Sequence, residues 1–222
     1  MNNLITLKKI TKNFFNNKKI SVLKKIDYSF KKGKVYSIMG PSGSGKSTLL
    51  NILSMIDKPT SGSLSINNII INFSKTVDND KIRSKKIGII YQQNNLLSDF
   101  TALENVYLAR LAVDNNKKKS VEASKKIIKQ MGLTSRENHY PSELSGGEIQ
   151  RIAIARAIYR NPEILFMDES TSALDIKTEN LILNDIKKNF PKKTIVMIAH
   201  RKTSLEKCDE VWTLENGEIL LK

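Results

Sequence analysis

The nine residues from Gly40 to Thr48 read GPSGSGKST and match the pattern G-x-x-x-x-G-K-[S/T]. Glycines let several backbone N–H groups point at one anion, and a helix beginning there directs its positive dipole end at the same anion. Lys46 adds a mobile cation for the β- and γ-phosphates, and the Ser47 hydroxyl is a ligand for Mg²⁺. We therefore expect ATP and Mg²⁺ as cofactors. The expected nucleotide-binding residues of this phosphate loop are Gly40, Pro41, Ser42, Gly43, Ser44, Gly45, Lys46, Ser47 and Thr48.

Two acidic residues follow an apolar segment later in the chain. The segment ILFMDES places Asp168 and Glu169 directly after four apolar residues. A strand that stays apolar to its carboxyl end belongs inside a parallel sheet, and ligands bind at that end. We expect Asp168 to hold Mg²⁺ through a water molecule and Glu169 to polarise the attacking water. The alternative role for Asp168 is the cap of a helix or turn.

A glycine pair opens a helical segment in LSGGEIQR, Leu144–Arg151. Glycines are poor helix formers, but at a helix start they let an anion come close to the backbone N–H groups. Because Gly40–Thr48 already accounts for the phosphates of one ATP, a second anion site makes sense when two copies of the chain face each other. We expect Ser145, Gly146 and Gly147 to bind the nucleotide of the other copy, giving a two-fold symmetric homodimer on ATP binding.

Short apolar runs alternate with amphipathic segments, which indicates an α/β fold. Strands are predicted over 34–40, 86–92, 163–169 and 193–200, a helix over 45–56, and a hairpin around the Asn-Asn pair of 62–73. Thr101 and Glu104 fit a capping box at the start of a further helix. Another helix is expected to stop at Gly132. The middle of the chain is therefore predicted to be a helical insert in an otherwise parallel sheet.

The composition limits the partners and the compartment. The 222 residues carry a formal net charge of +15 and one cysteine, Cys208, so no internal disulfide is expected. No apolar run approaches the about 20 residues that span a bilayer, and we expect no secretion signal at the start. The charge could attract nucleic acid or an anionic membrane face, or it could be a solvated surface rich in lysine. The spread of the lysines favours the solvated surface, and no nucleic-acid partner is expected.

The motifs stand in one order along the chain: the phosphate loop, Gln92, Leu144–Glu148, Ile164–Glu169, Ser172–Asp175 (SALD) and His200. In this order the whole chain resembles the ATP-binding cassette family, the nucleotide-binding subunits of ABC transporters. The resemblance implies an α/β fold with a P-loop NTPase parallel-sheet core, an N-terminal antiparallel β portion and a helical signature subdomain. It implies one domain over 1–222, with the core formed by 1–92 and 162–222 and the helical subdomain by 93–161.

The resemblance also implies roles at the edge of the nucleotide site. Phe14 lies where the family stacks an aromatic ring on adenine, with Phe15 as the less favoured candidate. Such stacking contributes roughly 1–3 kcal/mol per base. The alternative is that each phenylalanine is a buried core residue. Asp175 is implied to lie at the seam between the two copies and to contribute to nucleotide binding.

Further catalytic roles follow from the same resemblance. Gln92 is implied to sense the γ-phosphate and to be a Mg²⁺ ligand, with the adjacent Gln93 as the alternative. His200 is implied to contact the γ-phosphate and to orient Glu169. Ser170 departs from the proline that the family commonly has there, which removes a restraint on φ before SALD.

The implied function is that of a Mg²⁺-dependent ATPase coupled to transport. Separate transmembrane permease subunits are expected near 92–100 and the helical insert, with this chain cytoplasmic and peripheral on the inner face of the cell membrane. The segments DKPTSG and NNLLSDFTALENV resemble the lipoprotein-releasing and macrolide-efflux type, which implies bacterial export or extraction of a lipophilic or peptide cargo. The IAHR segment is more typical of larger exporters.

Other functions share parts of this pattern. The main alternative is a non-transport cassette ATPase that regulates a membrane partner in cell division or wall remodelling. DNA-repair and translation cassettes normally carry a coiled-coil insertion or two tandem cassettes, and this chain shows neither pattern. A small-molecule P-loop kinase would leave LSGGE without a purpose.

Overall fold

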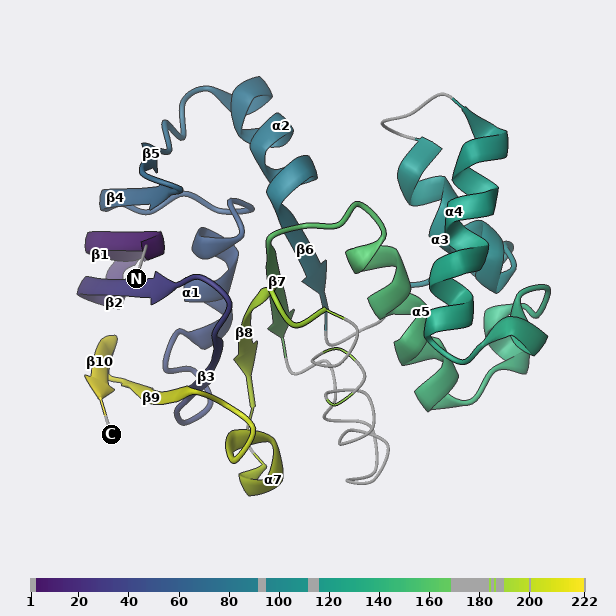
Figure 1. Cartoon of the computed structure of the whole chain (residues 1–222). Coiled ribbons are helices and arrows are strands. Elements are labelled where there is room, and N and C mark those ends of the chain that lie inside the picture. Colours follow the sequence, from purple (N-terminus) through teal and green to yellow (C-terminus); the bar gives the residue numbers. More distant parts are fainter. Residues whose placement is uncertain are drawn as a thin grey trace.

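The computed structural model describes residues 3–91, 95–111, 116–168, 184, 186, 190–199 and 201–221. Within these residues the strands form two sheets, one of four strands and one of six (Figure 1). The expected α/β class is confirmed. The two sheets matter for function because the residues that border the phosphate loop come from both of them.

The four-stranded sheet is antiparallel, which confirms the expected N-terminal β portion, and its order is β2-β1-β4-β5. Its strands are β1 (Asn3–Asn16), β2 (Lys18–Lys31), β4 (Ser61–Ile66) and β5 (Ile69–Ile70). The hairpin expected around the Asn-Asn pair is present. Asn67 and Asn68 have φ values of 51° and 63°, which suit a two-residue hairpin turn. Its second strand is shorter than expected.

The six-stranded sheet has the order β10-β9-β3-β8-β7-β6. Its strands are β3 (Val35–Met39), β6 (Ile87–Ile90), β7 (Ile164–Asp168), β8 (Thr194–Ile198), β9 (Glu210–Glu215) and β10 (Glu218–Leu221). All neighbours are parallel except β9 and β10. The expected parallel-sheet core is present, and this antiparallel hairpin, which was not expected, extends it at one edge. Its turn is Asn216-Gly217, and both residues have positive φ values, as such turns require.

The α-helices are α1 (Lys46–Leu53), α2 (Thr76–Lys86), α3 (Ala102–Leu111), α4 (Lys117–Gln130), α5 (Gly146–Ile158) and α7 (Lys202–Leu205), and 3₁₀ turns cover Thr134–Arg136 and Pro141–Glu143. The expected capping box of α3 is confirmed, because Glu104 accepts hydrogen bonds from the N–H and hydroxyl of Thr101 at 2.9 and 3.0 Å. α4 stops before Gly132, as expected, while α1 ends earlier than the expected Ile56. α2 was not expected.

The described hydrophobic residues form two cores on opposite faces of the six-stranded sheet. One core fills the space between the two sheets, where α1 lies, and the other joins the sheet to α3, α4 and α5 (Figure 1). Successive residues of β7 serve the two cores in turn, because side chains alternate along a strand. Ile164 and Phe166 belong to the first, and Leu165 and Met167 to the second. Both faces of β7 are therefore covered up to Asp168.

An aromatic cluster holds the two sheets together at one end. Tyr28 and Phe30 of β2 meet Tyr36 of β3 and Trp212 of β9. The Tyr28 and Trp212 ring centroids are 4.6 Å apart, and those of Phe30 and Tyr36 are 5.0 Å apart. Such pairs contribute about 0.5–1.5 kcal/mol beyond the area that they bury. The cluster anchors β2, which also lines the phosphate loop, against the strand that carries this loop.

Gly88 gives a test of how closely α5 packs on β6. A Cβ at this position would lie 2.7 Å from both the Ala157 carbonyl oxygen and the Leu165 Cδ2. We expect Gly88→Val to lower the free energy of unfolding by about 1–3 kcal/mol in urea titrations, because the core must shift to admit it. Ile69→Val on exposed β5 is the control, with a change within about 0.5 kcal/mol. A wild-type urea midpoint for Gly88→Val would contradict this packing.

Candidate functional site

The phosphate loop connects the carboxyl end of β3 to the start of α1. Two of its glycines have backbone conformations that other residues rarely adopt, with φ of 144° at Gly40 and 101° at Gly45. A Cβ on Gly40 would lie 2.1 Å from the Leu214 carbonyl oxygen, and one on Gly45 would lie 2.9 Å from the Val22 Cγ1. Atoms of both sheets therefore pack closely against the loop, and only glycine fits at positions 40 and 45.

Lys46 occupies the centre of the phosphate loop. Its side chain is buried, and its Nζ donates hydrogen bonds to the carbonyl oxygens of Gly40 at 3.0 Å and Pro41 at 2.9 Å. The loop thus wraps around its own ammonium group at the start of α1, where the helix dipole is also positive. A cation and a helix N-terminus that meet at one place favour an anionic ligand.

A cavity of about 490 Å³ lies against this loop. It is lined by Val22, Ser42, Gly43, Gly45, Lys46, Ser47 and Thr48. Six of these residues belong to the predicted phosphate loop, and Val22 of β2 was not expected. The volume is in the range of small-molecule sites, which is about 300–1,000 Å³. The cavity therefore has room for a nucleotide phosphate chain, with part of its wall supplied by the antiparallel sheet.

Ser47 and Asp168 meet at the mouth of this loop. The Ser47 hydroxyl donates a hydrogen bond to the Asp168 Oδ1 at 3.2 Å, which joins the first turn of α1 to the carboxyl end of β7. Mg²⁺ takes oxygen ligands, and in nucleotide sites it uses one or two side chains and completes its shell with phosphate oxygens and water. A hydroxyl and a carboxylate at one point fit that requirement. Within the described part of the chain, no group of three or more His, Cys, Asp or Glu forms another metal site.

The segment LSGGE forms the start of α5, and Ser145 caps it. Glu148 accepts hydrogen bonds from the Ser145 N–H at 2.8 Å and from its hydroxyl at 3.0 Å, and the Glu148 N–H donates to the Ser145 Oγ at 3.4 Å. This capping box was not expected, although Ser145 and Glu148 have the same spacing as Thr101 and Glu104. Gly146 and Gly147 are the first residues of the helix. Their N–H groups are among those without a carbonyl partner inside a helix.

Arg136 holds the outer side of the same carboxylate. Its Nε donates to the Glu148 Oε1 at 2.9 Å, and its guanidinium also lies 3.3 Å from the His139 Nε2. Hydrogen bonds from the Ser145 backbone, and then from Arg136, lower the pKa of Glu148 to about 2. The acid is therefore ionised at neutral pH and fixes the first turn of α5. Arg136 was not expected to contact this segment.

Phe14 lies near the end of β1, opposite Ile20 of β2. It is 44% exposed and Phe15 is 77% exposed, so neither serves the core role that was the alternative for both. The Lys12 ammonium lies 5.0 Å from the centroid of the Phe14 ring. The ring has open surface for a ligand, and its adenine-stacking role stays a prediction.

Four further predicted site residues, Gln92, Glu169, Asp175 and His200, lie outside the described residues, as do Gln93 and Ser170. Their roles stay predictions. The structure brings together the phosphate loop, Asp168 and Val22 in one place. The hydrogen bonds described between Ser145 and Glu148 stay within the first turn of α5, and Ser145, Gly146 and Gly147 do not line the cavity at the phosphate loop. The anion-binding role of Ser145–Gly147 stays a prediction.

The carboxylate of Glu148 gives a test by pH. We expect Glu148→Ala to lower the free energy of unfolding by about 1 kcal/mol at pH 7, the usual loss for a capping side chain. Because folding lowers this pKa from 4.5 to about 2, the stabilisation is complete above pH 4.5 and is lost as the pH falls towards 2. Urea unfolding of variant and wild type at pH 7 and pH 3 measures it, with Glu122→Ala on exposed α4 as control. A difference that does not depend on pH would contradict this assignment.

Comparison with known proteins agrees with this geometry. Residues 23–172, more than half of the chain, match the family described as ABC transporter. The chain is 41% identical over 221 residues to the lipoprotein-releasing system ATP-binding protein LolD of Rickettsia bellii, and the match covers 98% of both chains. It is 40% identical over 225 residues to the methionine import ATP-binding protein MetN 1 of Oenococcus oeni, covering 98% of this chain and 63% of that one.

A solved structure has the same fold. It is the ATP-binding cassette MJ0796 in a dimeric, post-hydrolysis state bound to ADP and Pi, and it matches with a TM-score of 0.89 at 38% identity over 97% of this chain and 96% of that one. MJ0796 is an uncharacterized ABC transporter ATP-binding protein of Methanocaldococcus jannaschii, 40% identical over 223 residues, or 97% of this chain and 95% of that one. The chain therefore belongs to the ABC transporter family, as one of its ATP-binding cassettes.

Proposed function

We propose that this chain is the Mg²⁺-dependent ATPase subunit of a bacterial transporter, which dimerises on ATP and drives the export or extraction of a lipophilic or peptide cargo through separate membrane subunits. The observation that carries the proposal is the buried Lys46 ammonium, which lies in a glycine-built loop beside the Ser47 and Asp168 pair. These groups supply what a nucleotide triphosphate and its Mg²⁺ require.

The dimer follows from the two separate anion-binding segments. One ATP has a single triphosphate, so the start of α5 needs a phosphate from elsewhere, and a second copy placed head to tail supplies it. Each nucleotide would then lie between the phosphate loop of one copy and Ser145–Gly147 of the other, with Asp175 at the seam. The structure of MJ0796 bound to ADP and Pi, and a second structure of that protein, are both described as dimeric, which supports this arrangement.

The chain's own groups suggest how the site acts. When ATP enters, Lys46 exchanges the carbonyl oxygens of the loop for phosphate oxygens, while the backbone N–H groups bind the same phosphates. Ser47 and Asp168, with Gln92, would hold Mg²⁺, which supplies charge neutralisation at the γ-phosphate. Glu169 would activate the attacking water, and His200 would contact the γ-phosphate and orient Glu169. Loss of the γ-phosphate removes the bridge between the copies, and the dimer loosens.

A groove on one edge of the molecule suits a membrane partner. It has a volume of about 610 Å³ and is bordered by α2 and β6. Its lining residues are Val77, Asp80, Lys81, Arg83, Ser84, Ile87, Ile89, Tyr91 and Arg160. Tyr91 directly precedes Gln92, so a partner in this groove would lie next to the residue that we propose to sense the γ-phosphate. A partner docked in this groove could therefore respond directly to whether ATP or ADP occupies the site.

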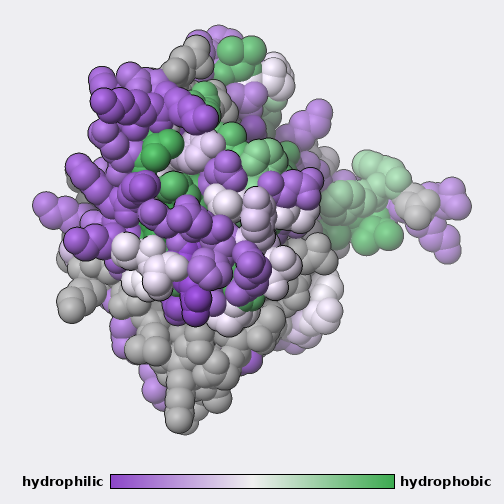
Figure 2. All heavy atoms as spheres, turned by 90° about the vertical axis from the view of Figure 1, so that its right-hand side faces the viewer, coloured by the Kyte–Doolittle hydropathy of each residue, from purple (hydrophilic) through white to green (hydrophobic). Residues whose placement is uncertain are grey.

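The membrane-crossing part must come from another chain in this proposal. No helix within the described ranges has the length and apolarity to span a bilayer. The described part of the face in Figure 2 is mainly hydrophilic, with hydrophobic side chains in small groups. We therefore propose a peripheral position on the inner face of the membrane, with attachment through permease subunits.

The helices that follow the groove form the second unit of the proposed domain. α3, α4 and α5 share a core with one another and with one face of the six-stranded sheet. We propose that 93–161 is the helical subdomain and that 1–92 and 162–222 form the catalytic core. In this division the phosphate loop belongs to the core and Ser145–Gly147 to the helical part, so the two anion sites are on different units.

The type of cargo rests on the names of the relatives. LolD of Rickettsia bellii is 41% identical to this chain and MetN 1 of Oenococcus oeni is 40% identical. The match to LolD supports the lipoprotein-releasing type that the sequence segments favour. The membrane subunits determine which cargo is bound, so we propose only the class of cargo, a lipid-linked substrate. Co-purification of an inserted permease, with ATP-driven release of such a substrate from liposomes, tests the class.

Lys46→Ala tests the phosphate loop. Removing a charged partner of the β- and γ-phosphates costs about 1.5–3 kcal/mol, so we expect the Kd for MgATP to rise about 10- to 100-fold in calorimetric titrations. Lys8→Ala, an exposed lysine on β1, is the matched control and should bind as the wild type does. Equal affinities for Lys46→Ala and wild type would show that the loop is not the ATP site.

Glu169→Gln tests the symmetric dimer. We expect this variant to bind ATP, to hydrolyse it poorly and to elute as a dimer in gel filtration, because the bridging γ-phosphate persists. Adding Ser145→Arg should return it to a monomer that still binds ATP, since the bulky cation fills the anion site at the start of α5 that would take the nucleotide of the partner copy. Ser74→Arg, at an exposed position before α2, is the control for the added charge. An ATP-loaded Glu169→Gln monomer would contradict the dimer.

A further inference from the structure

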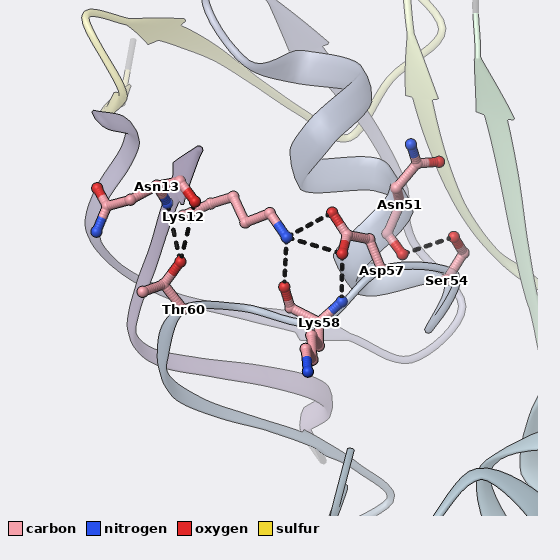
Figure 3. A network of polar contacts seen from close by, with 7 residues as sticks. All are labelled: Lys12, Asn13, Asn51, Ser54, Asp57, Lys58 and Thr60. Atoms are coloured by element: carbon pink, nitrogen blue, oxygen red, sulfur yellow. Dashed lines mark hydrogen bonds and ion pairs between the residues drawn. The ribbon is translucent and has the colours of Figure 1, made fainter. Parts of the chain in front are cut away.

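Lys12 is a charged side chain that the fold buries outside the phosphate loop. It lies on β1, is 8% exposed, and its ammonium makes two hydrogen bonds and an ion pair (Figure 3). Its Nζ lies 2.7 Å from each carboxylate oxygen of Asp57 and 2.8 Å from the Lys58 carbonyl oxygen. Burying an ammonium is costly unless it is paired and hydrogen-bonded. This position therefore calls for a lysine with a specific partner.

The partner belongs to the loop that follows α1. Asp57 Oδ1 also accepts the Lys58 N–H at 2.7 Å, which fixes the carboxylate on its own loop. The same loop joins β1 again through Thr60, whose hydroxyl accepts the Asn13 N–H at 2.9 Å (Figure 3). The Thr60 N–H also donates to the Thr11 carbonyl oxygen at 2.8 Å. α1 begins at the phosphate loop and ends at the loop that carries Asp57 and Thr60. These bonds therefore connect the phosphate loop, through α1, to the end of β1.

The ammonium also touches the aromatic ring two residues along the strand. It lies over the Phe14 ring, 5.0 Å from the centroid, where the π-face attracts a cation. Phe14 keeps exposed surface and pairs with Ile20, two residues from the Val22 that lines the phosphate-loop cavity. Lys12 thus binds one ring while it is itself bound to the loop after α1.

We propose that Lys12, held by Asp57, is a positioning residue that sets the Phe14 ring at the right distance from the phosphate loop to stack on adenine. The inference rests on the proposed function, because it assumes that ATP occupies the cavity. The cation takes part of one face of the ring and leaves open surface for the base. Lys12 touches no phosphate-loop residue in the contacts described, so its effect should reach the base and not the phosphates.

Comparison of two ligands separates these effects. MgATP carries the base, and magnesium tripolyphosphate carries the phosphates alone. We expect Lys12→Met to raise the Kd for MgATP by about five- to tenfold, part of the stacking contribution of one base. The Kd for tripolyphosphate should change by less than about twofold, since the phosphate contacts are untouched. Lys8→Met removes the same charge from an exposed position on the same strand and should change neither value.

Two further variants keep the test decisive. Asp57→Asn removes the charge that holds Lys12 and leaves the Lys58 carbonyl contact, so it should act in the same direction with a smaller effect, even where Lys12→Met folds poorly. In a Phe14→Leu background, Lys12→Met should raise the Kd for MgATP no further, because the ring on which it acts is gone. Thermal unfolding of each variant reports any loss of fold separately.

The outcomes distinguish this inference from the proposed function. Equal weakening of MgATP and tripolyphosphate by Lys12→Met and Asp57→Asn would overturn the inference, because Lys12 would then support the whole site. Unchanged MgATP affinity in both variants would overturn it as well. If Phe14→Leu binds MgATP as the wild type does, the adenine assignment itself fails. If Phe14→Leu weakens MgATP and the other two variants do not, only the positioning role fails.

Discussion

The burial of one ammonium group at the carboxyl edge of a parallel sheet is the constraint on which the nucleotide site depends. The phosphate loop has to pass around Lys46 closely enough for its own carbonyl oxygens to bind the cation. That path forces the backbone into conformations that suit glycine at Gly40 and Gly45, where neighbouring atoms leave no room for a side chain. The hydrophobic residues of α1 then secure the loop, because they fill the core between the two sheets. Chemistry and packing are thus fixed by the same few residues.

The proposed nucleotide site draws on both sheets. The six-stranded sheet carries the phosphate loop and Asp168 at the ends of β3 and β7, and the four-stranded sheet carries Val22 and the exposed Phe14, which is proposed to stack on adenine. The aromatic cluster around Trp212 joins the two sheets directly, and the Lys12–Asp57 pair joins β1 to the loop that follows α1. In the proposed function the nucleotide would span both sheets, and its base and phosphate chain would bind together only when the two subsites keep a constant separation.

Sequence patterns correctly predicted those structural features that depend on contacts between residues close together in the chain. The phosphate loop, the strand ending at Asp168, the Asn67-Asn68 turn and the cap at Thr101 each depend on residues close together in sequence. The Lys12–Asp57 and Arg136–Glu148 pairs escaped prediction because the fold brings their members together, and no spacing rule connects lysine and aspartate on a strand and a distant loop. The β9–β10 hairpin was not predicted, although Asn216-Gly217 is a residue pair typical of a two-residue hairpin turn. The roles of Gln92, Glu169, Asp175 and His200 still depend on the motif order alone.

The strand order has a consequence for the nascent chain. β3, which leads into the phosphate loop, lies between β8 and β9, so both of its neighbours are translated long after the loop itself. The Leu214 carbonyl that closes against Gly40 comes from β9. A ribosome-bound fragment that contains the entire glycine-rich loop therefore has Val22 of β2 beside Gly45 but lacks the Leu214 carbonyl beside Gly40. The surroundings that shape the loop are complete only after β8 and β9 have been synthesised.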